Sequence, residues 1–385
     1  MRGSIACVVS VAVCVSALVA STAPAAEWSG SATLFLREEY NDNILMTTAP
    51  HDTVWGSTAS SLLTLAMRDE RLQVKAAALT EYTRYAGQQG LDTTIYDLTL
   101  SPVYTTGRAT WGLDGELKQD LTLGGELQET GVVLTRSRRR TGSVGPSLTW
   151  ALTEKTSLQW QYRLTHVLYP GGDPGLVNYD LQEATMAAIV SATERSSVTV
   201  SLDYTEYRAT SVSYLSRDYA ARIELTHHFT ELTTGSLAAG GHQSTSTAGS
   251  SGTDRQWGWL FDGHLERQSE VMTVTGRVSH EVYPSGAGYL LEVAHASGQI
   301  NRNLFLSLSV FASADAYLST ALRTDIHIPD SRYYSTGAGL SWKWNEHWAT
   351  DASYQYSRQD APEVVKANVV YLRVVFTGDT VFSSP

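Results

Sequence analysis

The feature that most constrains this chain is an alternation of side-chain character with a period of two residues. Within residues 332–357, one face of the pattern is apolar and aromatic and the other is small and polar, with a turn at 345–347. Successive side chains of a β-strand point to opposite faces of its sheet. The segment therefore predicts a hairpin with one apolar and one polar face, which a water-soluble sandwich would also contain.

Repetition of the pattern favours a membrane barrel over a sandwich. The alternation recurs along the whole chain, for example where Leu158, Trp160 and Tyr162 alternate with polar residues, and short connections alternate with long ones. Outer-membrane barrels have short periplasmic turns and long external loops. The sequence predicts an all-β fold, a transmembrane antiparallel up-and-down β-barrel of about 18 strands (16–18 by count), with its apolar side toward lipid.

The first 25 residues have the features of a secretory signal peptide. Arg2 precedes an apolar stretch at 5–20, and residues 23–25 (Ala-Pro-Ala) form a small-residue cleavage site. The alternative is an uncleaved anchor, although the apolar stretch is shorter than the ~20 residues of a spanning helix. We expect a signal peptide at 1–25, a barrel at 26–376 and a short periplasmic tail at 377–385, in the cell outer membrane with both termini periplasmic.

Composition excludes several classes of site. Cys7 and Cys14 both lie in the predicted signal peptide, so the mature chain would have no disulfide, zinc–thiolate site or cysteine nucleophile. The net charge of -11 argues against a nucleic-acid partner. We predict no metal and no cofactor. We also predict no catalytic residues, because His264 and Asp262 share a face without a recognisable nucleophile.

The opening strand and loop at 38–44 (Glu-Glu-Tyr-Asn-Asp-Asn-Ile) resemble the start of a porin-2-like family of outer-membrane β-barrels that is associated with exopolysaccharide export loci. The resemblance implies an outer-membrane barrel that serves as the exit pore for a secreted polymer, with polysaccharide and periplasmic export components as partners. One departure is the end of the chain: many outer-membrane proteins end on an aromatic residue, whereas this one ends Phe-Ser-Ser-Pro at 382–385.

The polar faces of the predicted strands should line a water-filled lumen, because a barrel of this size is wide enough for a channel. The longest loops are under ~20 residues, and no segment has the features of a plug domain. An excess of carboxylates would favour cations or neutral polar solutes, although the charges could instead pair across the wall. The predicted lumen-lining residues are Lys75, Arg163, Arg222, Arg277, Lys343, Arg373, Glu81, Asp97, Asp114, Glu116, Asp203, Asp262 and Asp351.

Two further groups are predicted to contact the membrane. A basic cluster, Arg136, Arg138, Arg139 and Arg140, could bind an acidic sugar or a lipopolysaccharide phosphate near an outer loop, or could be a solvated junction. Tryptophans near the ends of strands are typical of a membrane girdle, and outer-membrane lipid and lipopolysaccharide are therefore expected partners. The predicted girdle residues are Trp111, Trp150, Trp160, Trp342, Trp344 and Trp348.

These patterns predict a non-enzymatic outer-membrane channel with a polar lumen, interpreted as the exit pore for an exopolysaccharide. One alternative is a general porin for small hydrophilic solutes. A second is an outer-membrane hydrolase, for which the sequence offers no compact catalytic set.

Overall fold

The computed structural model describes residues 26–48, 51–210, 213–248, 253–322, 330–360 and 364–383. The signal peptide predicted at 1–25 lies outside these residues. Among the residues that are described, no helix is both long and apolar enough to cross a membrane.

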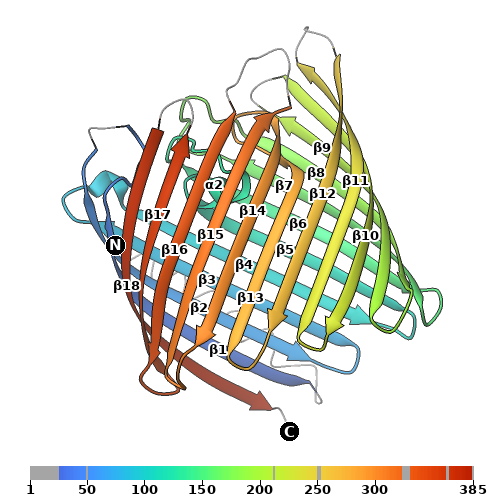
Figure 1. Cartoon of the computed structure of the whole chain (residues 1–385), viewed down its shortest axis with the longest axis horizontal. Coiled ribbons are helices and arrows are strands. Elements are labelled where there is room, and N and C mark those ends of the chain that lie inside the picture. The colour runs from blue at the N-terminus through green and yellow to red at the C-terminus, as the bar shows by residue number, and fades with distance from the viewer. Residues whose placement is uncertain are drawn as a thin grey trace.

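The described residues form one closed antiparallel sheet of 18 strands, in which each strand pairs with the next in the sequence (Figure 1). The ring closes between β1 and β18, whose register runs from Glu27 opposite Ser383 to Asn41 opposite Val369. The predicted transmembrane barrel is confirmed. The strands are β1 Glu27–Asn41, β2 Val54–Arg68, β3 Leu72–Tyr85, β4 Thr93–Thr105, β5 Ala109–Leu121, β6 Arg138–Ala151, β7 Thr156–Leu168, β8 Tyr179–Ser191, β9 Ser196–Ala209, β10 Tyr214–Thr230, β11 Thr233–Ala248, β12 Thr253–Gln268, β13 Met272–Pro284, β14 Leu290–Asn303, β15 Leu308–Ala321, β16 Ser331–Lys343, β17 Trp348–Asp360 and β18 Val364–Ser383.

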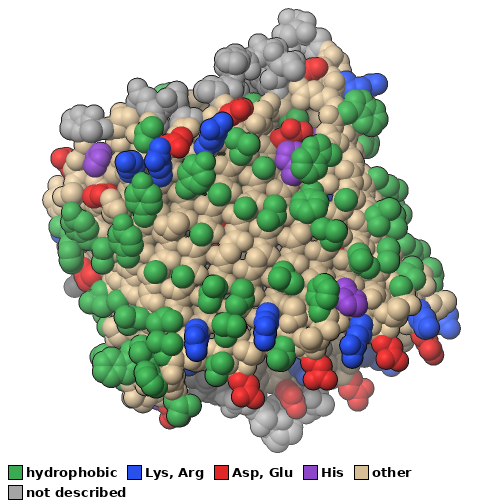
Figure 2. All heavy atoms as spheres, in the orientation of Figure 1, with side chains coloured by type: hydrophobic (Ala, Val, Ile, Leu, Met, Phe, Trp, Pro, Cys, Tyr) green, Lys and Arg blue, Asp and Glu red, His purple; other side chains and the backbone are tan. Residues whose placement is uncertain are grey.

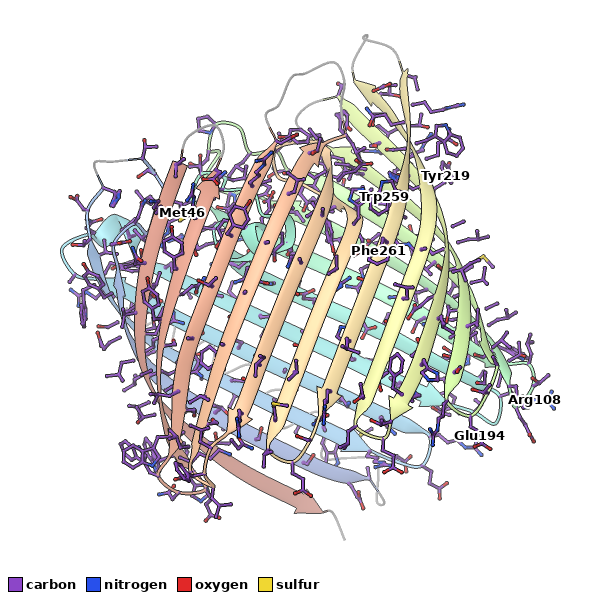
Figure 3. All side chains as sticks on the ribbon, in the orientation of Figure 1. Met46, Arg108, Glu194, Tyr219, Trp259 and Phe261 are labelled. Atoms are coloured by element: carbon purple, nitrogen blue, oxygen red, sulfur yellow. The ribbon has the colours of Figure 1, made fainter. Side chains whose placement is uncertain are left out.

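The two rims of the barrel differ. The connections at one rim are short turns such as 69–71, 106–108 and 344–347, and we call this rim the turn end. The other rim, the loop end, carries the long connections 42–53 and 122–137. Figure 3 shows Arg108 and Glu194 at the turn end, and Met46 closer to the loop end.

The outer wall of the barrel is apolar. Large side chains that alternate with the lumen positions are exposed, including Leu36 (67%), Leu202 (61%) and Trp257 (76%). Figure 2 shows apolar side chains spread over this wall, with charged groups toward the two rims. Exposed apolar side chains on every part of a closed sheet indicate contact with lipid. All six predicted girdle tryptophans are exposed. Trp344 lies in the turn 344–347, and the other five lie on this wall, namely Trp111, Trp150, Trp160, Trp342 and Trp348.

The last strand is longer than the sequence predicted. β18 continues to Ser383, and its residues 377–383 pair with Glu27–Thr33 of β1, so these residues form part of the wall rather than a periplasmic tail. The Gly-Asp pair at 378–379 has a local preference for turns. Pairing with the full length of β1 satisfies the backbone groups and overrides that local preference.

Candidate functional site: the lumen and its constriction

The connection between β5 and β6 folds into the lumen instead of projecting outward. It contains a short helix, α2 (Gly125–Thr130), which lies inside the ring in Figure 1. Leu127 of α2 packs in a cluster with Leu291 and Val293 of β14 and with Tyr317 of β15. β5 and β14 are nine places apart in a ring of 18 strands, on opposite sides of the barrel. The connection therefore crosses the lumen.

Hydroxyl groups of the opposite wall anchor the C-terminal end of α2. Tyr317 Oη donates to the Gln128 carbonyl at 2.8 Å, and Ser319 Oγ donates to the carbonyl of Thr130. These bonds satisfy carbonyl groups that a helix end leaves without partners. Gly131 follows with φ 68°, and a Cβ there would overlap the Cβ of Tyr317. Only glycine fits this close approach in a left-handed conformation.

Arg139 fastens α2 to its own side of the barrel. The buried guanidinium donates to both carboxylate oxygens of Asp120 on β5, at 3.0 and 2.8 Å. It also donates to both oxygens of Glu129 on α2, at 2.9 Å each. Two bidentate pairs on one guanidinium give a defined orientation as well as attraction. Arg139 therefore joins β5, β6 and α2.

The predicted anion-binding cluster is divided between two faces of the wall. Arg139 is buried beside α2. Arg136 donates to the Leu91 carbonyl at 2.9 Å with its guanidinium over the Tyr85 ring. Burial lowers the pKa of Arg136. Arg138 and Arg140 are exposed on the outer wall. Alternation along β6 accounts for this division, and the prediction of one shared anion site across all four residues is wrong in its geometry.

A second connection, residues 285–289 between β13 and β14, also enters the lumen. Residues 261–268 of β12 pair with residues 273–280 of β13, and the two strands do not pair nearer the loop end. The β13–β14 hairpin is therefore free to lean inward at the loop end. There Tyr207 Oη of β9 donates to the Ser285 carbonyl at 2.9 Å, and the Val177 amide donates to the Gly286 carbonyl at 2.7 Å. Leu290 packs in a cluster that includes tyrosines of β8, β9 and β10.

Glu126 joins the two inward segments. Its Oε1 accepts from the Gly286 amide at 2.6 Å and from Ser285 Oγ at 3.1 Å, and its Oε2 accepts from Tyr169 Oη at 2.8 Å. The residue is 1% exposed. Burial raises the pKa of its carboxyl group, and the three donors offset that effect only in part. We call Glu126, Arg139, α2 and residues 285–289 the constriction.

The raised pKa of Glu126 predicts that docking of α2 depends on pH. The docked form binds more protons than an undocked form with the ordinary pKa of 4.5. Docking should therefore be most stable below about pH 4.5 and weaken as the pH rises through the raised pKa. In planar bilayers, we expect conductance to increase across this window, and Glu126→Gln should remove the increase.

The control for this titration is Glu346→Gln, in the exposed turn 344–347 at the opposite rim. That variant should keep the pH dependence of the parent protein. A Glu126→Gln channel with an unchanged pH profile would contradict the assignment of the titration to Glu126.

The thirteen predicted lumen residues all alternate with exposed apolar positions and so face the interior. On the β9–β13 side, Arg222 lies 3.4 Å from Asp203 and 2.7 Å from Glu281, and Arg277 lies 3.0 Å from Glu281 and 2.6 Å from Asp262. Arg373 pairs with Asp351 at 2.6 Å. The alternative that charges pair across the wall therefore holds for this side. Asp262, paired with Arg277, forms no hydrogen bond with His264 among the described residues.

The β3–β5 side is different. Glu81, Asp97, Asp114 and Glu116 lie within salt-bridge distance of no Lys or Arg among the described residues, and Asp114 is bonded by Ser101 Oγ at 2.7 Å. Lys118 is 3.4 Å from Asp120. We call Glu81, Asp97, Asp114 and Glu116 the acidic strip. Lys75, Arg163 and Lys343 complete the lumen residues, with Arg163 opposite Glu183 in the strand register.

Comparison with solved structures agrees with this architecture. The chain is similar to OccK2 (OpdF) of Pseudomonas aeruginosa, with a TM-score of 0.53 and 10% identity over 91% of this chain and 98% of that chain. The barrel shares the fold of OccK2. The same protein in complex with glucuronate gives a TM-score of 0.49 at 10% identity (91% and 98% covered), and the outer membrane protein opdK of that organism gives 0.48 at 9% (91% and 99%). Neither protein-family models nor curated proteins give a match to this sequence.

No sequence pattern indicated the constriction. Glu126, Tyr169 and Ser285 come from three different connections, and no pattern along the chain links them. The nearest signal is the run 124–131, where glycines flank a short helical segment. Among the described residues, no group of three or more potential ligands could hold a metal ion.

Proposed function

We propose that this protein is an outer-membrane channel for small hydrophilic solutes. The observation that carries the proposal is the combination of an apolar outer wall with a lumen side on which charged residues face water. A closed ring leaves no unpaired strand edge in lipid, so the wall separates two solvents. The shared fold with OccK2 supports the barrel, and the solute is inferred from the lumen itself.

The constriction favours small solutes over a polymer. α2 and residues 285–289 are held by buried hydrogen bonds and ion pairs that connect several strands. A polymer wider than the remaining opening would have to displace both segments. Small polar molecules would pass beside them while exchanging water for contacts with hydroxyl and charged groups.

The acidic strip favours cations and neutral solutes over anions. Carboxylates on one side of a lumen create a negative potential that concentrates cations and repels anions. The paired residues of β9–β13 contribute less to this potential, because each arginine lies between carboxylates. Selectivity should therefore depend on the β3–β5 side.

This selectivity can be measured from reversal potentials in a KCl gradient across planar bilayers. The parent channel should prefer K⁺ to Cl⁻, and the combined substitution Asp97→Asn, Asp114→Asn and Glu116→Gln should move the permeability ratio toward one. Glu38→Gln is the matched control, because Glu38 lies on the outer wall beside Trp55. An unchanged ratio in the triple variant, or an equal change in the control, would show that the strip does not set selectivity.

Exopolysaccharide exit, which the family resemblance implies, remains a prediction. It would require α2 and residues 285–289 to leave the lumen during transport. Deleting the gene and measuring surface polymer would test it: a loss of polymer would support export, and unchanged polymer would leave the small-solute channel as the function.

A further inference from the structure

The outer wall near the loop end carries a charged patch that faces lipid. Five exposed groups lie on it: Arg138 and Arg140 on β6, His166 on β7, Arg208 on β9 and Arg217 on β10. The anions on the patch are Asp180 and Glu206, so with histidine neutral its charge is +2 (four arginines minus two carboxylates). The whole chain, in contrast, has a net charge of -11.

The patch borders a groove of about 490 Å³ on the same wall. One row of register partners crosses it, from Leu117 to Gly142, His166, Asp180 and Arg208 on β5 to β9. Gly142 has no side chain and forms the floor of the groove. The row therefore changes from apolar on one side of the glycine to charged on the other.

Toward the middle of the wall, the groove is lined by Val144 and Leu164, which are 43% and 41% exposed. Toward the loop end, it is bordered by Arg140, whose Nε donates to Gln119 at 2.8 Å. The groove thus has an apolar half at the depth of acyl chains and a basic half at the depth of headgroups. This gradient matches the two parts of an anionic lipid.

The arginines are held in position but keep donors free for a ligand. Glu206 accepts from Arg208 Nη2 at 3.0 Å and from Arg217 Nε at 2.9 Å, which holds the two guanidinium groups on either side of one carboxylate. Asp180 lies 2.5 Å from His166. A guanidinium has five donors, and one or two bonds of each group are used here. The others can bind phosphate oxygens in the bidentate manner that guanidinium groups favour.

We infer that this groove binds a lipopolysaccharide molecule of the outer leaflet, with one lipid A phosphate at Arg140, the other at Arg208 and Arg217, and an acyl chain along Val144 and Leu164. Basic clusters at headgroup depth recognise anionic lipids through these contacts. The inference rests on the proposed placement of the barrel, in which the loop end faces the outside. It concerns the outer wall only, so it is independent of what passes through the lumen.

The test measures retention of hexa-acylated lipid A by the full-length barrel in detergent, using native mass spectrometry. The parent protein should retain one bisphosphorylated lipid A molecule in preference to the dephosphorylated form and to phosphatidylglycerol. Arg140→Ala combined with Arg208→Ala should weaken binding by roughly tenfold or more, as expected for the loss of charge-assisted hydrogen bonds. The matched control is Arg84→Ala combined with Arg302→Ala, which removes two cations from other parts of the wall.

Gly142→Leu provides an independent variant that leaves every charge in place. A Cβ at this position would lie 3.5 Å from Leu117 Cδ2, an ordinary contact, so the wall should tolerate the side chain while the groove is filled. Binding should fall in this variant too. Equal binding of dephosphorylated lipid A or phosphatidylglycerol, or equal losses in the control pair, would overturn the inference. Conductance should stay at the parent level in every variant. A parent protein that bound lipid A but showed no conductance would contradict the channel proposal and leave this inference standing.

Discussion

Removing α2 from the lumen should raise single-channel conductance several-fold. Conductance depends on the narrowest cross-section, and α2 crosses the lumen from β5 and β6 to β14 and β15. Replacing residues 124–133 by a short Gly-Ser linker would remove the helix while keeping Thr122 and Ser137, which bond to each other at the base of the connection. Planar-bilayer recordings would measure the change, and liposome swelling would show whether larger sugars enter.

A point substitution should produce part of the same effect. In Gly131→Val, the new side chain would overlap Tyr317 and require an unfavourable backbone conformation, so α2 could not dock. Gly107→Val is the matched control, because Gly107 lies in the turn 106–108 and a Cβ added there would have no atom within 4 Å. If conductance stayed the same in both the linker variant and Gly131→Val, α2 would not be the narrowest point of the lumen.

Replacing Arg139 by leucine should produce the largest loss of stability of any single substitution that we consider. The change removes both guanidinium hydrogen bonds of the buried Asp120, which keeps only Lys118 at 3.4 Å. It also removes the only bonds from β6 to Glu129 among the described residues. Breaking a buried ion pair by removing one partner lowers the free energy of unfolding by about 3–5 kcal/mol. Urea unfolding from lipid vesicles, followed by tryptophan fluorescence, would measure the difference.

Arg138→Leu is the natural comparison, because the two arginines are adjacent in sequence and face opposite sides of the wall. Arg138 is exposed toward lipid, so this variant should unfold within about 0.5 kcal/mol of the parent protein, as is usual for surface substitutions. Equal destabilisation of the two variants would mean that charge at this rim, rather than the bonds of Arg139 to Asp120 and Glu129, determines stability.

The wall of the barrel was predictable from the sequence because each strand carries its own evidence. Leu158, Trp160 and Tyr162 face one solvent and their neighbours face another, so the period of two marks both the strand and its orientation. The number of strands and the eight short turns follow from the same pattern. The lumen-facing residues are predictable for that reason, since an inward position is any position that alternates with an apolar one.

The constriction could not be predicted in this way, because its partners are far apart in the sequence. Glu126 meets Gly286 across 160 residues, and Thr130 meets Ser319 across 189. A connection of 16 residues between β5 and β6 has the same composition whether it projects outward or folds into the lumen. Arg139 shows the same limit. Its sequence neighbours indicated a basic patch, whereas its role depends on two carboxylates that the fold brings beside it, Asp120 of β5 and Glu129 of α2.

The register of β1 against β18 has a consequence for how the protein is made. Glu27 and Ser383 are partners, so the seam joins the start of the folded chain to its end. Before β18 pairs with β1, the partly folded sheet has two edge strands whose unpaired amide groups cannot be hydrated inside a bilayer. Biogenesis must therefore shelter those two edges until β18 has paired with β1, and a chain that lacks either strand would leave the sheet open in the bilayer.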